Sequence, residues 1–252
     1  MATVAWLQLR QMLAGKKVWM LTIFLLLPAG LSALIAAAGE WRGGEEEELL
    51  KAIYLFMVYP QAVCLLLALL YGTSLLNAEL EEKTITYLFT RPVPRWKVFL
   101  GKYAALVPWL AAPSLASLTG SWLLLGRPGG AALLGGMALA VLGSVAVYGA
   151  IFGLVGVVFR TRTLVIGVLY AVIFEFFLSF LPAVVSALSV THYLRSVVLK
   201  VTDLEVPEEV LVIVGNASLL ESAGVLGAIA LAAVGLASFV CTRREYVVAE
   251  QL

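Results

Sequence analysis

Six long apolar stretches, separated by short charged segments, run along this chain of 252 residues. A helix needs about 20 apolar residues to cross the hydrocarbon of a bilayer. Because lipid offers no hydrogen-bond partners to the backbone, only helices and closed barrels cross it, and long continuous runs favour helices. The predicted spans are Val18–Ala38, Ala52–Asn77, Tyr103–Leu125, Ala131–Phe159, Leu164–Ser189 and Ser222–Thr242.

The composition agrees with a membrane protein. Hydrophobic residues make up 62% of the chain and charged residues 13%, whereas about a quarter of the residues in a soluble domain are charged. We therefore predict an all-α integral membrane protein that forms a single transmembrane domain over residues 1–252. The first span follows Lys16 and Lys17 like a signal peptide, but its apolar core is too long, so it is predicted to be retained. The two cysteines, Cys64 and Cys241, are predicted to form neither a disulfide nor a metal site.

Basic residues are distributed unevenly between the two sides that the six spans define. The side that holds both termini carries 12 of the 17 Lys and Arg residues, and the other side carries the remaining 5. Cytoplasmic segments of membrane proteins carry the excess of Lys and Arg. Both termini are therefore predicted to be cytoplasmic, in a protein of a prokaryotic plasma membrane.

Residues 1–17 form an amphipathic segment before the first span. Trp6, Leu9 and Leu13 recur at helical spacing beside basic residues such as Arg10. Such a helix lies in the membrane interface with its basic side toward the lipid headgroups. We predict an interfacial elbow helix here; the alternative is that these residues are only the polar beginning of the first span.

Residues 78–100 form a charged island between the second and third spans. A residue that precedes proline is pushed out of the helical region, so the prolines at 92 and 94 end any helix that precedes them. A helix is therefore predicted from about Ala78 to Thr90, with Ile85, Leu88 and Phe89 on one face. The residues alone leave two equal alternatives, a helix that docks on a partner and a solvated loop.

This island also carries a resemblance to a known family. Its features are the acidic cluster Glu79-Leu80-Glu81-Glu82, the turn Lys83-Thr84-Ile85, the break Arg91-Pro92-Val93-Pro94-Arg95 and the pair Gly101-Lys102. Together with the closing Arg243-Arg244-Glu245, they resemble the membrane-spanning subunit of ATP-binding-cassette exporters of the type 2 permease family.

The resemblance implies a fold and a set of partners. In that family the island carries a coupling helix that sits in a cleft of a separate ATPase, so docking becomes the favoured alternative. The implied partners are two ATPase subunits, which bind ATP and Mg, and a second permease half in a homodimer; no nucleic acid is expected. The implied coupling residues are Glu79, Lys83, Thr84, Ile85, Leu88, Phe89, Arg91, Pro92 and Arg95.

Glu175 is the single ionisable residue deep within a predicted span. Such residues are costly in lipid and usually face a cavity or a partner. Two roles remain open, one in substrate passage or gating and one as a hydrogen-bonded structural group. In either role the nearby hydroxyls of Tyr170 and Ser179 are candidate partners, and Pro182 indicates a tilted or broken helix.

Small residues recur along the fourth predicted span, in particular Gly149 and Gly153. The spacing Gly-x-x-x-Gly lets membrane helices approach closely, so a packing role is favoured over a substrate groove or a hinge. Residues 190–219 are predicted to form an external loop with short helices, which either covers an exit path or only connects two spans.

The chain lacks a phosphate-binding loop, so it is predicted not to be an ATPase itself, and no cofactor is expected in it. We interpret the chain as the permease half of an ATP-driven exporter. Its cargo is predicted to be apolar or amphipathic, because the spans contain few polar groups. The alternatives are a membrane assembly or metalloenzyme-maturation factor without transport of its own, and a secondary transporter. A secondary transporter usually has more charges near the midplane than Glu175 alone.

Overall fold

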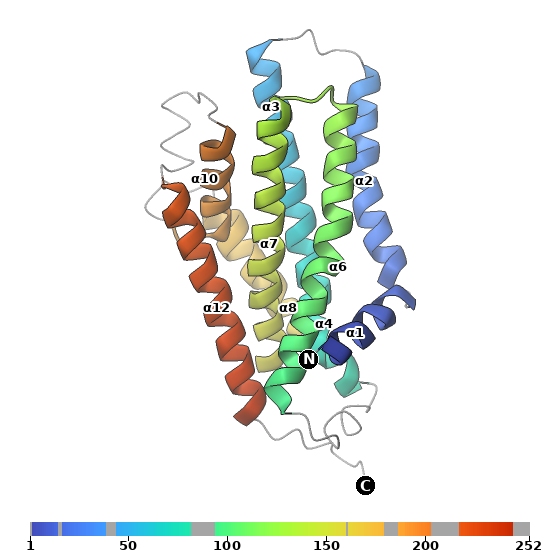
Figure 1. Cartoon of the computed structure of the whole chain (residues 1–252), viewed down its shortest axis with the longest axis vertical. Coiled ribbons are helices and arrows are strands. Elements are labelled where there is room, and N and C mark those ends of the chain that lie inside the picture. The colour runs from blue at the N-terminus through green and yellow to red at the C-terminus, as the bar shows by residue number, and fades with distance from the viewer. Residues whose placement is uncertain are drawn as a thin grey trace.

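The structure is a computed structural model, and it describes residues 2–14, 17–38, 44–81, 94–159, 161–178, 186–202 and 217–243. Every regular element in these residues is a helix (Figure 1). In chain order the elements are α1 (Ala2–Ala14), α2 (Lys17–Ala38), α3 (Glu45–Phe56), η1 (Met57–Val63), α4 (Cys64–Glu81), α6 (Arg95–Leu124), α7 (Gly130–Val158), α8 (Thr163–Tyr170), η2 (Ala171–Phe177), α10 (Val190–Thr202) and α12 (Leu219–Arg243), where η1 and η2 are π-helical.

Five helical segments among the described residues are long and apolar enough to cross a membrane. They are Val18–Ala38, Glu47–Leu75, Trp96–Leu124, Gly130–Val158 and Leu219–Arg243. The chain is therefore a multi-pass, all-helical membrane protein, as the composition and the apolar runs predict. These five segments coincide with five of the six predicted spans.

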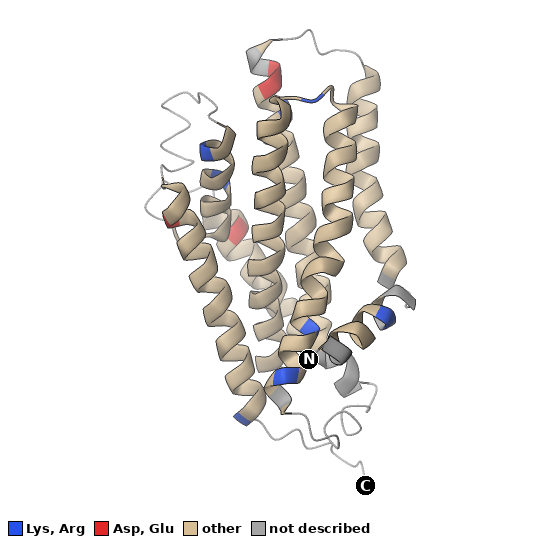
Figure 2. Ribbon diagram, in the orientation of Figure 1, with Lys and Arg blue, Asp and Glu red and all other residues tan. Residues whose placement is uncertain are grey.

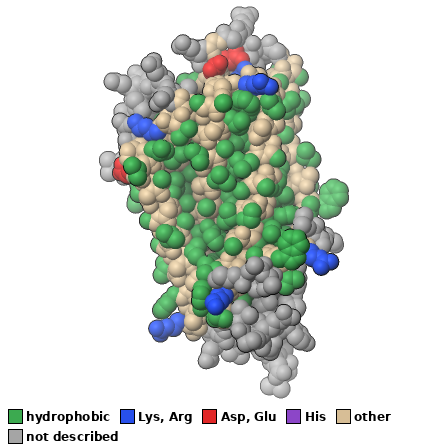
Figure 3. Space-filling view, in the orientation of Figure 1, with side chains coloured by type: hydrophobic (Ala, Val, Ile, Leu, Met, Phe, Trp, Pro, Cys, Tyr) green, Lys and Arg blue, Asp and Glu red, His purple; other side chains and the backbone are tan. Residues whose placement is uncertain are grey.

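The helices form a bundle with two ends (Figure 1). We call the end that holds α1, the start of α6 and the end of α12 the N-terminal end, and the end that holds the start of α3 and the α6–α7 turn the distal end. Charged residues gather at the two ends and are sparse between them (Figure 2). Between the ends, the visible face is covered mostly by hydrophobic side chains (Figure 3). Such a band matches the apolar middle of a bilayer.

The outermost helices have the apolar surface that lipid contact requires. On α2 the large side chains Trp19, Ile23 and Leu27 are exposed, and on α12 Leu231 and Phe239 are exposed. In water such a surface would be an aggregation site, whereas in a bilayer it faces hydrocarbon. These exposed apolar side chains therefore support membrane insertion of both helices.

Helix α7 lies at the centre of the bundle and contacts α4, α6, α10 and α12. Its small residues allow these close contacts. A side chain on Gly156 would meet the carbonyl oxygen of Thr73 on α4 at 2.7 Å. The predicted pair lies in the same helix: Gly149 faces Leu106 of α6, and Gly153 faces both Leu75 of α4 and Phe99 of α6.

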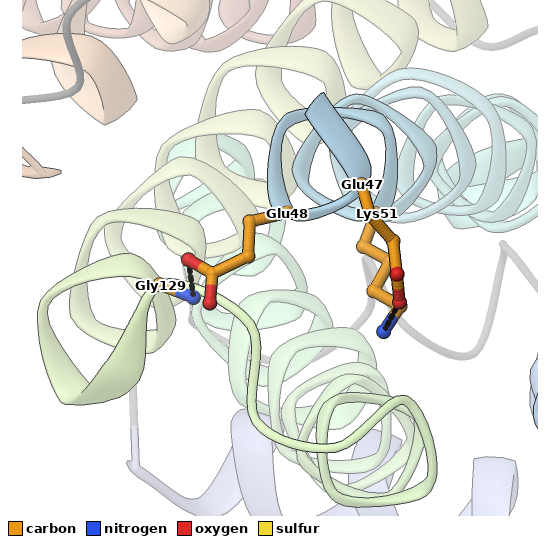
Figure 4. Close-up of polar contacts among 4 residues, drawn as sticks. All are labelled: Glu47, Glu48, Lys51 and Gly129. Carbon is orange, nitrogen blue, oxygen red and sulfur yellow. Dashed lines mark hydrogen bonds and ion pairs between the residues drawn. The ribbon is translucent and has the colours of Figure 1, made fainter. Parts of the chain in front are cut away.

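The distal end is closed by the α6–α7 turn and by α3. Gly126 and Gly129 of this turn adopt positive φ angles of 85° and 57°, which glycine accepts without strain. The Glu48 carboxylate of α3 accepts a hydrogen bond from the Gly129 amide at 3.4 Å, while Glu47 forms an ion pair with Lys51 one turn further along (Figure 4). This acidic helix start therefore contacts the turn directly.

The fifth predicted span differs from the prediction. A single helix over Leu164–Ser189 is wrong, because α8 and η2 end at Phe177 and a turn at Ser186–Ser189 precedes a new helix, α10. Residues 179–185 between them, including Ser179 and Pro182, lie outside the described part. The described pieces are each shorter than a hydrocarbon core of about 30 Å, since the 13 residues of α10 measure about 20 Å and the 15 residues of α8 and η2 measure at most about 22 Å.

Helix α10 lies within residues 190–219, and the external location predicted for that stretch stays a prediction. It packs against α7 and α12, and most of its residues are buried, including Thr191, His192 and Ser196. Its end near Thr202 lies beside Gly136 of α7, and its beginning lies beside Tyr148. Since α7 ends at the N-terminal end and α12 begins at the distal end, α8–η2 and α10 together complete one discontinuous crossing (Figure 1).

Two further predictions concern the N-terminal end. Helix α1 is separate from α2, lies at an angle to it, and contacts α2 and α6 with Met12 buried (Figure 1). Trp6 remains exposed, and the interfacial location of this helix stays a prediction. Of the predicted coupling helix, Ala78–Glu81 continue α4, and residues 82–93 lie outside the described part.

Candidate functional site

The strongest polar cluster in the described part surrounds Glu175, whose side chain is 1% exposed. Oε2 accepts hydrogen bonds from the Tyr148 hydroxyl at 2.8 Å, the Thr191 hydroxyl at 2.8 Å and the Thr191 amide at 3.1 Å. Oε1 accepts from the Val190 amide at 3.1 Å and the Tyr170 hydroxyl at 3.3 Å. The two oxygens of a carboxyl group together offer enough lone pairs to accept from all five donors at once. The cluster thus joins α7, α8, η2 and α10 at one group.

The carboxylate caps the first turn of α10. The first amides of a helix have no partners within it and need acceptors from outside. Here the Val190 and Thr191 amides donate to Glu175, and the His192 amide donates to Oγ of Ser189 at 3.2 Å. Ser189 is a typical N-cap residue, and a carboxylate at this position also interacts favourably with the helix dipole. These side chains allow α10 to begin inside the bundle.

The π-helical turn of η2 explains why Tyr170 and Glu175 share a face. These residues are five apart, a spacing that an α-helix rotates away from a common face and a π-helix, with its i→i+5 pairing, brings together. Tyr170 also stacks on Phe174 at a centroid distance of 5.1 Å and meets Phe152 of α7 edge-on at 5.8 Å. The aromatic contacts hold the Tyr170 hydroxyl next to the carboxylate.

The depth of the cluster follows from its position on α7. Tyr148 lies ten residues before the end of that helix, which corresponds to about 15 Å at 1.5 Å per residue. Tyr148 also lies 18 residues, about 27 Å, after the beginning of α7, so the carboxylate lies well inside the length of this apolar span. The cation of Arg195, one turn further along α10, interacts electrostatically with Glu175 and lies 5.9 Å from the ring of Phe56. A buried carboxylate at this depth is thus stabilised by five donors and a nearby cation.

This arrangement determines what the cluster can do chemically. Both carboxylate oxygens are occupied by donors of the protein, so the group offers no vacant acceptor to a cargo while these bonds persist. Breaking the cluster would leave a charge unpaired in an apolar environment, which is costly. Both roles that the sequence left open stay predictions, and a role in passage requires that these bonds open.

A second buried polar contact lies closer to the predicted coupling segment. Lys102 of α6 is 2% exposed, and its Nζ donates to the carbonyl oxygen of Leu75 on α4 at 2.8 Å. The helices α4 and α6 flank residues 82–93 in the chain, so Lys102 joins the two helices that enter and leave that segment. A buried cation donating to a main-chain carbonyl fixes the two helices relative to each other.

The structure brings together some of the predicted site residues and leaves others outside its described part. Tyr170 contacts Glu175, as one alternative predicted. Glu79 lies in the last turn of α4 and Arg95 begins α6, with their side chains outside the described part. The same holds for all of Lys83, Thr84, Ile85, Leu88, Phe89, Arg91, Pro92 and Ser179, whose predicted roles stay predictions.

Sequence reasoning missed most partners of the buried carboxylate. Tyr148 is 27 residues before Glu175 in the chain, and Thr191 is 16 residues after it. One signal was available for α10, because Ser189 directly before the helix is a favoured N-cap residue. No comparable signal marks Tyr148, which reaches the carboxylate only because α7 packs against α10.

The comparisons with known proteins complete this description. A sequence model of one protein family, described as ABC-2 family transporter protein, matches residues 2–202. The match covers α1 to α10 and therefore includes both the predicted coupling segment and the Glu175 cluster. A comparison with curated proteins finds no match.

Proposed function

The chain belongs to the ABC-2 family of transporter proteins, and from this premise we propose that it is the permease half of an ATP-driven exporter. A separate ATPase hydrolyses ATP, and the permease converts the resulting movement into alternating access for an apolar or amphipathic cargo. The family match over most of the chain is the observation that carries this proposal. The five apolar spans of the bundle support it.

The predicted path of coupling runs through residues 78–100. Ile85, Leu88 and Phe89 would fill an apolar cleft of the ATPase, and Arg91 and Arg95 would contact charges at its rim. Helices α4 and α6 carry this segment at the N-terminal end, and Lys102 joins them directly beyond it. Movement of the segment would therefore be passed to both helices together.

The complex requires partners that the permease itself does not supply. We propose two ATPase subunits, each with ATP and Mg, and a second copy of this chain as the other permease half. Alternating access then needs the two copies to rearrange around a shared pathway, with the apolar faces of α2 and α12 turned toward lipid or toward the second copy.

The most direct test of this function is ATP-dependent transport by the reconstituted complex. We expect the chain to copurify with an ATPase subunit in a ratio of one to one and to move an amphipathic fluorescent probe across vesicle membranes only when Mg-ATP is present on the ATPase side. An ATPase variant that binds but does not hydrolyse ATP is the control. A chain that moves the probe equally without ATPase would contradict the proposal and support a secondary transporter.

Orientation in the membrane provides a separate prediction. The N-terminal end carries Lys97 and Arg243 and is proposed to be cytoplasmic, which places Glu48 of α3 outside. We expect a cysteine at Glu48 to react in intact cells with a membrane-impermeant maleimide, and a cysteine at Lys97 to react only after the membrane is opened. Native Cys64 and Cys241 are buried and provide a low background. The opposite labelling pattern would contradict this orientation.

A further inference from the structure

The discontinuous crossing depends on a binding position for the N-terminus of α10, which we call its seat. Glu175 forms this seat. A broken helix at membrane depth is tolerated only where its free backbone groups are satisfied within the protein or by water in a cavity. In this chain the free amides of Val190 and Thr191 are both satisfied by Glu175. The same carboxylate accepts from Tyr148, so one side chain fixes the helix end to its neighbour α7.

Further along the contact between α10 and α7, two glycines of α7 lie directly against α10. A side chain at Gly136 would lie 3.4 Å from the Cα atom of Val198, and one at Gly143 would lie 3.1 Å from Leu194. At these two places the α7 surface offers no side chain that interlocks with α10. The directional contacts at the beginning of α10 are therefore hydrogen bonds. They are the five bonds of Glu175 and the bond between the Tyr148 and Thr191 hydroxyls at 3.2 Å.

The buried side of α10 is unusually polar for a helix inside an apolar bundle. Thr191, His192 and Ser196 are all buried, with the Ser196 hydroxyl donating to the His192 carbonyl at 3.1 Å. Polar side chains at this depth normally face the protein interior or a water-filled space. If α10 shifted away from its seat, water would therefore reach this face first.

We propose that Glu175 is a positioning residue that docks the N-terminus of α10 onto η2 and α7, and that this docking keeps the discontinuous crossing closed to water. The docking requires two acceptor oxygens, because three donors converge on Oε2 and two on Oε1. Glutamine has the same shape but replaces one acceptor oxygen with an NH₂ donor. In Glu175→Gln the new NH₂ group therefore faces the backbone amide donor of either Val190 or Thr191, and the substitution creates no cavity.

The test measures how easily water-soluble reagents reach the buried face of α10. Ser196→Cys places a thiol at a site that is 1% exposed, and Lys200→Cys places one at an exposed site on the same helix. Both are made in a Cys64→Ala, Cys241→Ala background, purified in detergent without any ATPase, and treated with a water-soluble maleimide. We expect Glu175→Gln to speed labelling at position 196 at least about tenfold, because hydrogen bonds to a buried charge are lost, and to leave labelling at position 200 unchanged.

Variants of the donors separate docking from general instability. Thr191→Val removes a hydroxyl donor and should also speed labelling at position 196, whereas Thr191→Ser keeps the hydroxyl and should retain the slow rate. If the Glu175 variant fails to fold, Tyr148→Phe replaces it. This variant removes the donor on α7 and should also speed labelling at position 196. Equal labelling at position 196 in all these proteins would overturn the proposal. Faster labelling of the buried native Cys241, when it is kept in a separate protein, would also overturn it, since that indicates general unfolding.

A second measurement links the docking to transport and rests on the proposed function. In the complex, Glu175→Gln should retain ATPase binding and ATP hydrolysis but transport fewer molecules of probe per ATP than the unchanged chain, and Thr191→Ser should transport normally. An unchanged ratio of transport to hydrolysis would overturn the claim that docking matters during transport. If the unchanged chain binds no ATPase, the proposed function fails, while the labelling result in detergent still decides whether Glu175 docks α10.

Discussion

Replacement of Gly156 by leucine is expected to abolish the accumulation of folded protein in the membrane. A Cβ atom at this position would lie 2.7 Å from the carbonyl oxygen of Thr73, 3.2 Å from its carbonyl carbon and 3.3 Å from the carbonyl oxygen of Gly72. All three atoms belong to the backbone of α4, so no side chain can rotate to make room. Overpacking a core costs about 1–3 kcal/mol even where neighbours can adjust.

The effect should be large because α4 and α7 form the most extensive contact in the bundle. Separating the two helices would also displace the contact between Gly72 and Phe152. We therefore expect loss of the monodisperse peak in fluorescence-detection size-exclusion chromatography.

Gly135→Leu is the matched control, because it introduces the same side chain into the same helix at a position with nothing within 4 Å. It should leave the peak and the yield nearly unchanged, as expected for a side chain that gains only lipid or solvent contacts. A Gly156→Leu protein that elutes and accumulates like the Gly135→Leu protein would show that α4 and α7 do not approach as closely as described.

The five continuous spans could be predicted from the sequence because the physical requirement is simple. A bilayer demands long apolar runs, and the runs that begin near Val18 and Ala131 meet that demand by composition alone. The break in the sixth crossing could not be predicted in the same way. The stretch Leu164–Ser189 is apolar on both sides of the break, and hydropathy does not distinguish one helix from two half-helices.

The site was predictable only in part for a similar reason. Glu175 is conspicuous because an ionisable group in a span is rare, and Tyr170 is close to it in the chain. Its other partners depend on the π-helical turn of η2 and on the packing of α10 against α7, which are properties of the assembled bundle. Local sequence patterns carry no information on contacts that join Tyr148 to Glu175 across 27 residues.

Substitutions in the proposed coupling segment, residues 78–100, are also expected to have a large effect, namely release of the ATPase. A soluble ATPase moves membrane helices only through a firm contact on the cytoplasmic side. Residues 82–94, which separate α4 from α6, are a longer connection at the N-terminal end than residues 159–162, which separate α7 from α8. Truncating a buried interface anchor commonly costs on the order of 2 kcal/mol or more, whereas an exposed rim charge contributes about 1 kcal/mol or less. Leu88→Ala combined with Phe89→Ala is therefore expected to release the ATPase, and Arg95→Ala to weaken the contact more mildly.

Membrane insertion should not depend on these side chains, because Leu88, Phe89 and Arg95 lie outside the five apolar spans. The doubly substituted chain should therefore elute as a monodisperse peak at normal yield when it is purified alone. The substitution Trp6→Ala is a suitable comparison, since it also truncates an exposed apolar side chain at the N-terminal end but lies outside the coupling segment. The Trp6 variant should retain the ATPase.

The amount of ATPase that copurifies with the Leu88→Ala, Phe89→Ala permease tests the coupling claim most directly. We expect that the unchanged permease retains one ATPase per chain, that the double variant loses most of it, and that any ATPase still bound hydrolyses ATP without moving the probe. A double variant that retains one ATPase per chain and transports at the normal rate would contradict the proposed coupling role of residues 78–100.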